Sequence, residues 1–354
     1  MLTDKKIVIT GGTGSLGKVL LRRLLSGEMG KPKKIVVFSR DEAKQHELRV
    51  DYQHRKVVTD EVIYNNFEQL LEFQIGDVRD YSAVCGVLKG ADVVFNAAAL
   101  KQVPACEYFP FEAVRTNVEG PNNIVRAIRD LDLKVQTVIG ISTDKAAKPV
   151  NVMGMTKALQ ERVFLRANID CPDTRFIVVR YGNVLASRGS VIPLFHEQIN
   201  NGGPLTITSE EMTRFLLSLD DAVDLIFAAM KNASRGETYI PRVPTANIKD
   251  LALELIGERD IDVKVTGIRP GEKLHEILIS EEEVLRTVER GNHYVILPIL
   301  PEIVGESRPD DKRTLSEEYS SEHGILNRDD VRNLLKERQL MIGDAIKLEG
   351  EFLR

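Results

Sequence analysis

The sequence predicts an α/β fold, with a doubly wound parallel sheet and a smaller, mainly C-terminal lobe. Short apolar runs alternate with helical, more charged runs through the first half of the chain, which is the pattern of a parallel sheet covered by helices on both faces. Glycines follow the first apolar run directly, and the alternation ends after Tyr181. The predicted strands are 6–10, 34–39, 71–75, 93–96, 135–142 and 175–180, and the predicted helices include 16–26, 41–52 and 220–231.

The same change in pattern divides the chain. Residues 1–181 form the predicted sheet domain, 182–300 a lobe interleaved with it, and 301–354 a charged tail with one helix. Asn327 is the expected N-cap of that helix, because its side chain can accept from a free backbone N–H of the first turn, and the helix continues through 331–338. One segment of the sheet domain, residues 55–69, is longer than a usual connection and is interpreted as an insertion without an assigned role.

Composition restricts the class of protein. The chain has 354 residues, of which 43% are hydrophobic and 29% charged, with a formal net charge of -5. This balance is globular, and its sign gives no general attraction to nucleic acid or anionic membranes. No apolar run approaches the roughly 20 residues that a membrane span needs, and the N-terminus lacks a secretory pattern. Cys85, Cys106 and Cys171 show no metal-ligand spacing, so we expect reduced thiols in a cytoplasmic protein without a metal site.

A glycine-rich turn joins the first strand to the first helix. Gly11 permits a tight turn, Gly14 lets the backbone approach a pyrophosphate, and Gly17 lets the helix pack close to the sheet. The free N–H groups at the start of the helix then face the phosphates. The strand–turn–helix context makes this a predicted dinucleotide site. Its expected phosphate-binding residues are Gly11, Thr13, Gly14, Ser15, Leu16 and Gly17.

The end of the second strand distinguishes NADP from NAD. An acidic residue there would bind the ribose 2′-hydroxyl of NAD and repel a 2′-phosphate. This strand ends with Ser39 and Arg40, and Lys44 follows one helical turn later. A hydroxyl and two cations are suited to a phosphate dianion. NADP is therefore the predicted cofactor, while Asp41, directly after Arg40, keeps NAD as the alternative.

The spacing Gly-x-x-Gly-x-x-Gly resembles the extended short-chain dehydrogenases, which have a Rossmann fold. By this resemblance Asp77 and Val78 lie at the adenine, the run 97–99 passes beside the cofactor, and Asn117 is the structural asparagine. The expected cofactor contacts in that run are Ala97, Ala98 and Ala99.

The segment after the fifth strand carries the predicted chemistry. Asp144 and Lys145 are an adjacent acid and base at a strand's carboxyl end, where open α/β sheets place their ligands. Met153 and Lys157 are four residues apart and share a helix face. The superfamily normally has Tyr and Lys at this spacing, with Tyr moving a proton and Lys binding the nicotinamide ribose. Methionine cannot move a proton, so either the protein is inactive or other groups perform the acid–base steps.

Several motifs together resemble the UDP-N-acetylglucosamine 4,6-dehydratases of bacterial glycan synthesis, over roughly residues 5–280. The family has members with Met at position 153, and some members also invert C5. The resemblance implies that hydride leaves sugar C4 for NADP, that water is eliminated across C5 and C6, and that hydride returns to C6. The motifs are Ser142–Ala146, Asn151–Gly154, Arg180–Val184, Ser187–Pro193, Met212–Phe215 and Arg269–Lys273.

The resemblance also assigns roles. Lys145 would be the base at C5, Asp144 the acid at O6, and Thr143 a hydrogen-bond partner of O4. The group that takes the 4-hydroxyl proton stays open, with Asp144 acting through Thr143 as the favoured one. The implied partner is UDP-N-acetylglucosamine, and the implied assembly is a homo-oligomer, since the family often forms hexamers. The implied substrate-binding residues are Arg214, Arg269 and Asn183 for the diphosphate, Glu272 for the ribose, Thr206 and Thr208 for uracil, and also Lys101.

Two other functions stay open. A UDP-sugar C4-epimerase shares the first hydride transfer but needs no acid at O6, so the adjacent Asp144 and Lys145 favour the dehydratase. A non-catalytic NADP-binding sensor would explain Met153, but Lys157 and the nucleotide-binding residues are retained.

Overall fold

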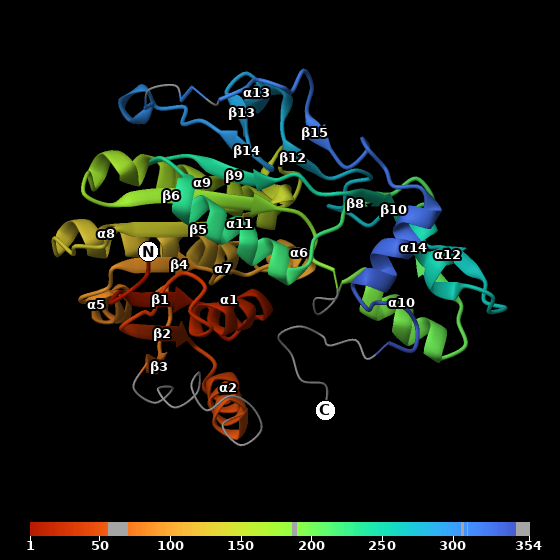
Figure 1. Cartoon of the computed structure of the whole chain (residues 1–354), viewed down its shortest axis with the longest axis horizontal. Helices are drawn as coiled ribbons and strands as arrows, with labels where there is room; N and C mark the ends of the chain where they lie inside the picture. Colours follow the sequence, from red (N-terminus) through yellow and green to blue (C-terminus); the bar gives the residue numbers. More distant parts are fainter. Residues whose placement is uncertain (56–69, 186–189, 306–307, 310, 345–354) are drawn as a thin grey trace.

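The computed structural model describes residues 1–55, 70–185, 190–305, 308–309 and 311–344. Within these residues the core is a nine-stranded sheet in the order β13-β14-β9-β6-β5-β4-β1-β2-β3 (Figure 1). The strands from β3 to β9 in this order run parallel, and β14 and β13 complete the sheet antiparallel. The strands are β1 (Lys6–Thr10), β2 (Lys34–Ser39), β3 (Leu71–Ile75), β4 (Val93–Asn96), β5 (Thr137–Thr143), β6 (Arg175–Tyr181), β9 (Thr238–Pro241), β13 (Thr287–Arg290) and β14 (His293–Ile296).

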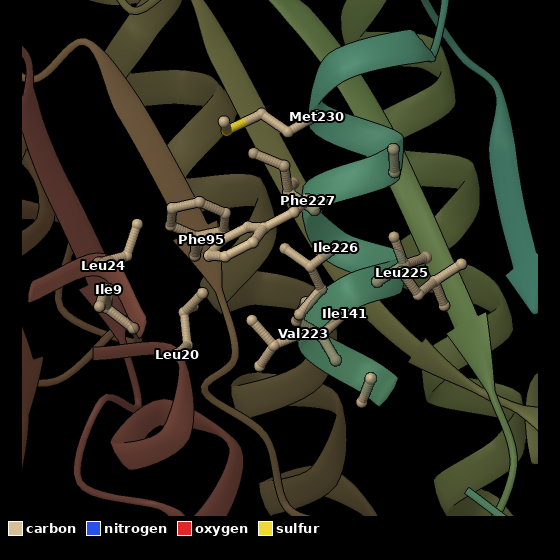
Figure 2. Close-up of a cluster of buried hydrophobic side chains, with 14 of the residues drawn as sticks. Ile9, Leu20, Leu24, Phe95, Ile141, Val223, Leu225, Ile226, Phe227 and Met230 are labelled. Carbon is tan, nitrogen blue, oxygen red and sulfur yellow. The ribbon is translucent and has the colours of Figure 1, made fainter. Parts of the chain in front are cut away.

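Side chains of each strand alternate between two apolar layers. Ile7 and Ile9 of β1 pack on the face covered by α1, α2 and α11, whereas Val8 packs on the face covered by α5, α8 and α9. Figure 2 shows part of the first layer, where Phe95 of β4 lies between α1 and Phe227 of α11. Successive side chains of a strand point to opposite faces, and helices cover both faces, so most residues of β1 and β2 are buried. The helices are α1 (Ser15–Leu25), α2 (Glu42–Arg55), α5 (Tyr81–Leu88), α8 (Gly120–Asp130), α9 (Val152–Asp170) and α11 (Leu219–Asn232).

The parallel strands all end on one edge of the sheet. Thr10 at the end of β1 pairs with Asn96 at the end of β4, and Thr143 of β5 pairs with Tyr181 of β6. This edge is where open α/β sheets bind ligands. The predicted fold class is confirmed, and the predicted strands and helices match to within one to three residues at their ends, which depend on local hydrogen bonds.

A second lobe has an apolar cluster of its own, at the right of Figure 1. Phe195, Leu251 and Leu335 are buried together there. The predicted N-cap is confirmed, because Asn327 Oδ1 accepts from Asp330 N at 3.0 Å. The lobe contains α10 (Val191–Asn200), α12 (Ile248–Ile256) and α14 (Arg328–Glu337), with the strand pairs β7 (Leu205–Ile207) with β11 (Val263–Val265) and β8 (Thr213–Phe215) with β10 (Thr245–Asn247).

The predicted domain boundaries at 181/182 and 300/301 stay predictions. Residues after 182 supply the second lobe, but they also supply α11 and three strands of the main sheet. The remaining strands and short helices are β12 (Ile277–Ile279) and β15 (Tyr319–Ser320), which pair with each other, α6 (Val103–Tyr108), α7 (Pro110–Val114), α13 (Glu281–Val284), the π-helix η1 (Arg115–Glu119), and the 3-10 helices η2 (Asp144–Ala146) and η3 (Pro301–Ile303).

A buried ion cluster joins the main sheet to α13. Arg180 on β6 is 2% exposed, and its guanidinium lies 2.6 Å from Glu161 Oε2 of α9 and 2.8 Å from Glu283 Oε2 of α13. Both carboxylates satisfy the buried cation, which would be costly to leave unpaired. Arg180, part of a motif in the sequence, therefore has a structural role here.

Some predicted features fall outside the described residues. These are most of the proposed insertion, at 56–69, the motif positions Ser187, Arg188 and Gly189, and the end of the tail from residue 345. In the part of the chain that is described, no helix combines the length and the apolar character needed to cross a bilayer. Cys85, Cys106 and Cys171 are all free thiols.

Two glycine substitutions should change stability in opposite directions. A Cβ at Gly17 would lie 2.5 Å from the backbone Cα of Gly12, whereas the nearest atom to a Cβ at Gly86, exposed on α5, is Gln74 Nε2 at 4.0 Å. We expect Gly17→Ala to lower the free energy of unfolding by about 1–3 kcal/mol. Gly86→Ala should raise it by about 0.5–1 kcal/mol, because alanine loses less entropy in a helix. Urea unfolding measures both, and an equal effect of the two substitutions would contradict this account.

Candidate active site

The glycine-rich turn has the shape that a dinucleotide phosphate requires. Gly11 has φ +67°, and a Cβ there would lie 2.7 Å from Ala98 Cα. At Gly14, the N-cap of α1, the nearest contact of a Cβ would by contrast be Gly11 O, at 3.4 Å. The first turn of α1 has no side-chain cap and no acidic residue. The N–H groups of Ser15, Leu16 and Gly17 are thus suited to an anion.

Polar groups beside this turn are arranged along the ends of β1 and β4. Asn117 holds the backbone of Leu100, accepting from its N at 2.8 Å and donating to its O at 2.9 Å. Thr10 Oγ1 accepts from Ala98 N at 3.3 Å, which fixes the run that contains Ala97, Ala98 and Ala99. Among the described side chains, Asn96 Nδ2 and Thr116 Oγ1 are buried without a hydrogen-bond partner. Buried polar atoms are normally satisfied, so these two fit contacts to a bound cofactor.

The predicted 2′-phosphate site contains carboxylates as well as cations. Arg40 Nη1 lies 3.6 Å from Asp77 Oδ2, and Lys44 Nζ lies 3.3 Å from Asp41 Oδ2. Ser39 Oγ accepts from Gln45 Nε2 at 3.0 Å. Hydrogen bonding from the Lys44 backbone, with the nearby Lys44 ammonium, holds the pKa of Asp41 below its ordinary value despite partial burial. The two cations are therefore present but paired.

A short turn after β5 brings the predicted catalytic residues into contact. Thr143 Oγ1 donates to Asp144 Oδ1 at 2.7 Å, and Lys145 Nζ donates to the same oxygen at 3.1 Å. Lys145 Nζ also donates to Asn183 Oδ1 at 3.0 Å, which comes from the loop after β6. Asp144 is fully buried, and its Oδ2 has no hydrogen-bond partner among the described residues. An acid, a base and a hydroxyl thus form one connected group.

Sequence reasoning missed a fourth member of this group. Glu276 Oε1 lies 3.3 Å from Lys145 Nζ and 3.7 Å from Arg214 Nε. Burial is the largest influence on the Lys145 ammonium and lowers its pKa, but the charges of Asp144 and Glu276 outweigh it, so the pKa is raised overall. The only signal in the sequence was that Glu276 follows Glu272 at a spacing of four residues.

The start of α9 packs directly on this turn. A Cβ on Gly154 would collide with the carbonyl oxygen of Lys145, so only glycine allows the approach. Met153 is buried against Cys106 and Ala113 in a small apolar cluster. Lys157 Nζ donates to the backbone oxygen of Ile141 at 2.5 Å and to Gln160 Oε1, one helical turn later, at 2.6 Å. Met153 and Lys157 are thus both buried on α9, and Met153 contributes an apolar side chain.

The predicted substrate-binding residues are placed less uniformly. Arg214 is buried, and its guanidinium donates to the backbone oxygens of Thr213, Lys273 and Leu274. Arg269 is exposed and lies 4.0 Å from Glu272, whose Oε2 is buried without a described partner. The other predicted residues lie at Thr206 on β7, hydrogen-bonded to Gln198, at Thr208 directly after β7, and at Lys101, exposed after β4.

The loop that contains Glu272 is tied to the catalytic turn. Asn151 caps α9 through its Oδ1, which accepts from Gly154 N at 2.8 Å, and its Nδ2 donates to Gly271 O at 2.9 Å. Lys273 Nζ donates to Ala147 O at 2.7 Å. The loop of Gly271 and Lys273 and the start of α9 therefore meet through side-chain contacts at the turn.

The buried ammonium of Lys157 should make stability depend on pH. Burial lowers its pKa from 10.5 to about 8, opposed only partly by the charge of Glu161. Between these values the unfolded state binds more protons, so stability rises with pH. Relative to Lys157→Met, the unaltered protein should gain about 2–3 kcal/mol of unfolding free energy from pH 7 to pH 10. Urea unfolding of both proteins measures this, and a constant difference between them would show that the amine is solvated.

Comparisons with known proteins identify the family of the chain. The family model described as polysaccharide biosynthesis protein matches residues 7–298. A relative from Rickettsia bellii (strain RML369-C), described as UDP-glucose 4-epimerase, is 44% identical over 301 residues, which cover 84% of either chain. A Methanocaldococcus jannaschii protein described as an uncharacterized membrane protein is 41% identical over 346 residues, covering 94% of this chain and 96% of that one.

Solved structures show the same architecture. Pen from Bacillus thuringiensis has a TM-score of 0.84 at 35% identity and covers 96% of this chain and 100% of its own. DesIV, a dTDP-glucose 4,6-dehydratase from Streptomyces venezuelae with NAD bound, has a TM-score of 0.63 at 21% identity, covers 76% of this chain and 86% of its own, and shows the fold alone. The chain belongs to the polysaccharide biosynthesis protein family, and its fold is that of the extended short-chain dehydrogenases that act as nucleotide-sugar dehydratases and epimerases.

Proposed function

We propose that the protein is an NADP-dependent UDP-N-acetylglucosamine 4,6-dehydratase. The observation that carries this is the direct contact of Asp144 and Lys145 at the end of β5, with Thr143 hydrogen-bonded to the same carboxylate. Elimination of water across C5 and C6 needs a base at one carbon and an acid at the neighbouring oxygen. One buried carboxylate and one amine, in contact with each other, supply both.

The residues of the turn and of α9 then have the following roles. NADP, when bound, accepts the C4 hydride and supplies it again at C6. Asp144 receives the 4-hydroxyl proton through Thr143 and gives a proton to the departing 6-hydroxyl. Lys145 removes the C5 proton and returns it after the hydride has been added at C6. Lys157 binds the nicotinamide ribose, and Met153 excludes water without moving a proton.

The nucleotide end of the substrate is assigned to the second lobe and its connecting loop. Arg269 is exposed and can turn toward a diphosphate, and the unpartnered Glu272 Oε2 is suited to ribose hydroxyls. The wider proposal is a cytoplasmic homo-oligomer that acts in bacterial surface-glycan synthesis. The further residues assigned to the substrate are Lys101, Asn183, Thr206, Thr208 and Arg214.

A C4-epimerase is the second candidate. It is supported by the Rickettsia bellii relative described as UDP-glucose 4-epimerase, at 44% identity over 84% of the chain. An epimerase would use the same C4 oxidation but would leave C5 and C6 unchanged. The Asp144–Lys145 contact therefore favours the dehydratase.

The product distinguishes these functions. The protein with NADP and UDP-N-acetylglucosamine in deuterated water should give a 6-deoxy product with a methyl signal and deuterium at C5, recorded by NMR. Asp144→Asn keeps the shape of the side chain but cannot carry a proton between oxygens, so the rate should fall at least about 10²-fold. Met153→Leu preserves an apolar side chain of similar size and should retain most activity.

Other results would point elsewhere. A 4-epimer without a methyl signal would identify an epimerase, and an unchanged sugar would support a non-catalytic NADP-binding sensor. Normal turnover of Asp144→Asn beside an inactive Met153→Leu would show that the acid is misassigned.

NADP preference rests on the cations after β2. Arg40→Ala should weaken NADP binding by about 1–3 kcal/mol, the scale of a lost charged hydrogen bond, and leave NAD binding nearly unchanged. Arg166→Ala is a matched control, because Arg166 lies on α9 and pairs with Asp170 at 3.0 Å. Calorimetry with both cofactors measures this, and tighter binding of NAD than NADP by the unaltered protein would disprove the preference.

A further inference from the structure

The proposed reaction requires a neutral amine at Lys145. A base must be neutral before it can remove the C5 proton, but two carboxylates, Asp144 and Glu276, stabilise the ammonium form. The site therefore needs a group that takes this proton. This reasoning rests on the proposed dehydratase function.

Glu276 is placed to be that group. Its residue is 3% exposed, its Oε1 lies 3.3 Å from Lys145 Nζ, and its Oε2 has no hydrogen-bond partner among the described residues. Its backbone is fixed by Ser321, whose Oγ accepts from Glu276 N at 2.9 Å and whose N donates to Glu276 O at 2.8 Å. A buried carboxylate with a free oxygen pays a large desolvation penalty while charged and a smaller one when protonated.

Asp144 is less suited to hold this proton. Its Oδ1 already accepts from Thr143 and from Lys145, and the proposed reaction uses it for the proton that moves from O4 to O6. Two independent protons need two carboxylates. Glu276 comes from the segment before β12 and has no other role in the proposed chemistry.

We propose that Glu276 accepts the ammonium proton of Lys145 and so provides the neutral amine that removes the C5 proton. An N–H bond of Lys145 breaks and an O–H bond of Glu276 forms, without any change in oxidation state. Two opposite charges disappear from a pair in which Glu276 is buried and Lys145 is half-buried, which lowers the desolvation penalty. In this proposal Glu276 is a positioning residue, because it acts on the sugar only through Lys145 and sets the protonation state of that amine.

Other charged groups face this pair. They are Asp144 on η2, Arg214 on β8, and Lys273 and His275 in the segment before β12, with Glu318 close to Lys273. Arg214 Nε lies 3.7 Å from Glu276 Oε1, and burial, the largest of several influences on Lys273, lowers the pKa of that amine. These groups are the same in the unaltered protein and in a Glu276 variant, so a difference between pH profiles isolates Glu276.

The test is the pH profile of kcat for methyl formation, with saturating NADP and UDP-N-acetylglucosamine. The unaltered enzyme should be nearly constant from pH 6 to pH 8, because the proton stays within the pair. Glu276→Gln should lose at least tenfold at pH 6.5 and then rise about tenfold per pH unit, since Lys145 must lose its proton to solvent. Glu276→Asp keeps a carboxylate and should restore a flat profile at a lower rate. Glu281→Gln, an exposed carboxylate on α13, is the matched control and should not differ from the unaltered enzyme.

The outcomes are separable. A flat Glu276→Gln profile, whether slower or faster than the unaltered enzyme, overturns the proton role and leaves the dehydratase intact. Absence of methyl product from the unaltered enzyme overturns the dehydratase and the proton role with it. If Glu276→Gln fails to bind NADP because it does not fold, Glu276→Asp decides, and a tenfold rise per pH unit in that variant overturns the role.

Discussion

The Lys145 ammonium is the interaction on which the arrangement of the site depends. Oxygen atoms from three separate segments lie within 3.3 Å of its Nζ, namely Asp144 after β5, Asn183 after β6 and Glu276 before β12. A half-buried cation between two buried carboxylates is stable only if such partners are held in place. The parallel pairing of Thr143 with Tyr181 brings the first two together, and the hydrogen bonds of Glu276 to Ser321, directly after β15, hold the third. Three segments that are far apart in the sequence thus contact the same ammonium group.

Few side chains join the loop of Gly271 and Lys273 to the turn after β5, and one of them, Asn151, has two functions. Asn151 caps α9 and also holds Gly271, while Lys273 reaches back to the carbonyl oxygen of Ala147. Gly154 contributes by lacking a side chain, since this allows α9 to lie on the carbonyl of Lys145. The helix that carries Lys157 and the loop that carries Glu272 are consequently held to the same turn of backbone.

The sequence predicted what depends on local pattern. Short apolar runs predicted the strands, helical runs predicted the helices, and the glycine spacing predicted the phosphate turn, because these are properties of neighbouring residues. Asp144 and Lys145 could be assigned because they are adjacent. Glu276 could not, because its contact with Lys145 joins segments that are far apart in the chain. The burial of Arg214 against the backbone of Thr213 and Leu274 had no sequence signal either. Every residue has a backbone oxygen, so the residue type does not indicate which one accepts a hydrogen bond.

The second lobe has an apolar core separate from the two layers of the main sheet. Substitutions at sites that share no contacts affect stability nearly additively. Substitutions around Phe195 or Leu251 should therefore change the packing of the second lobe without loosening the packing of β1 and α1. Substitutions at Asn151, Lys273 and Glu276 should not be additive in this way, because these residues contact the turn after β5. The two cores can thus accept substitutions independently of each other.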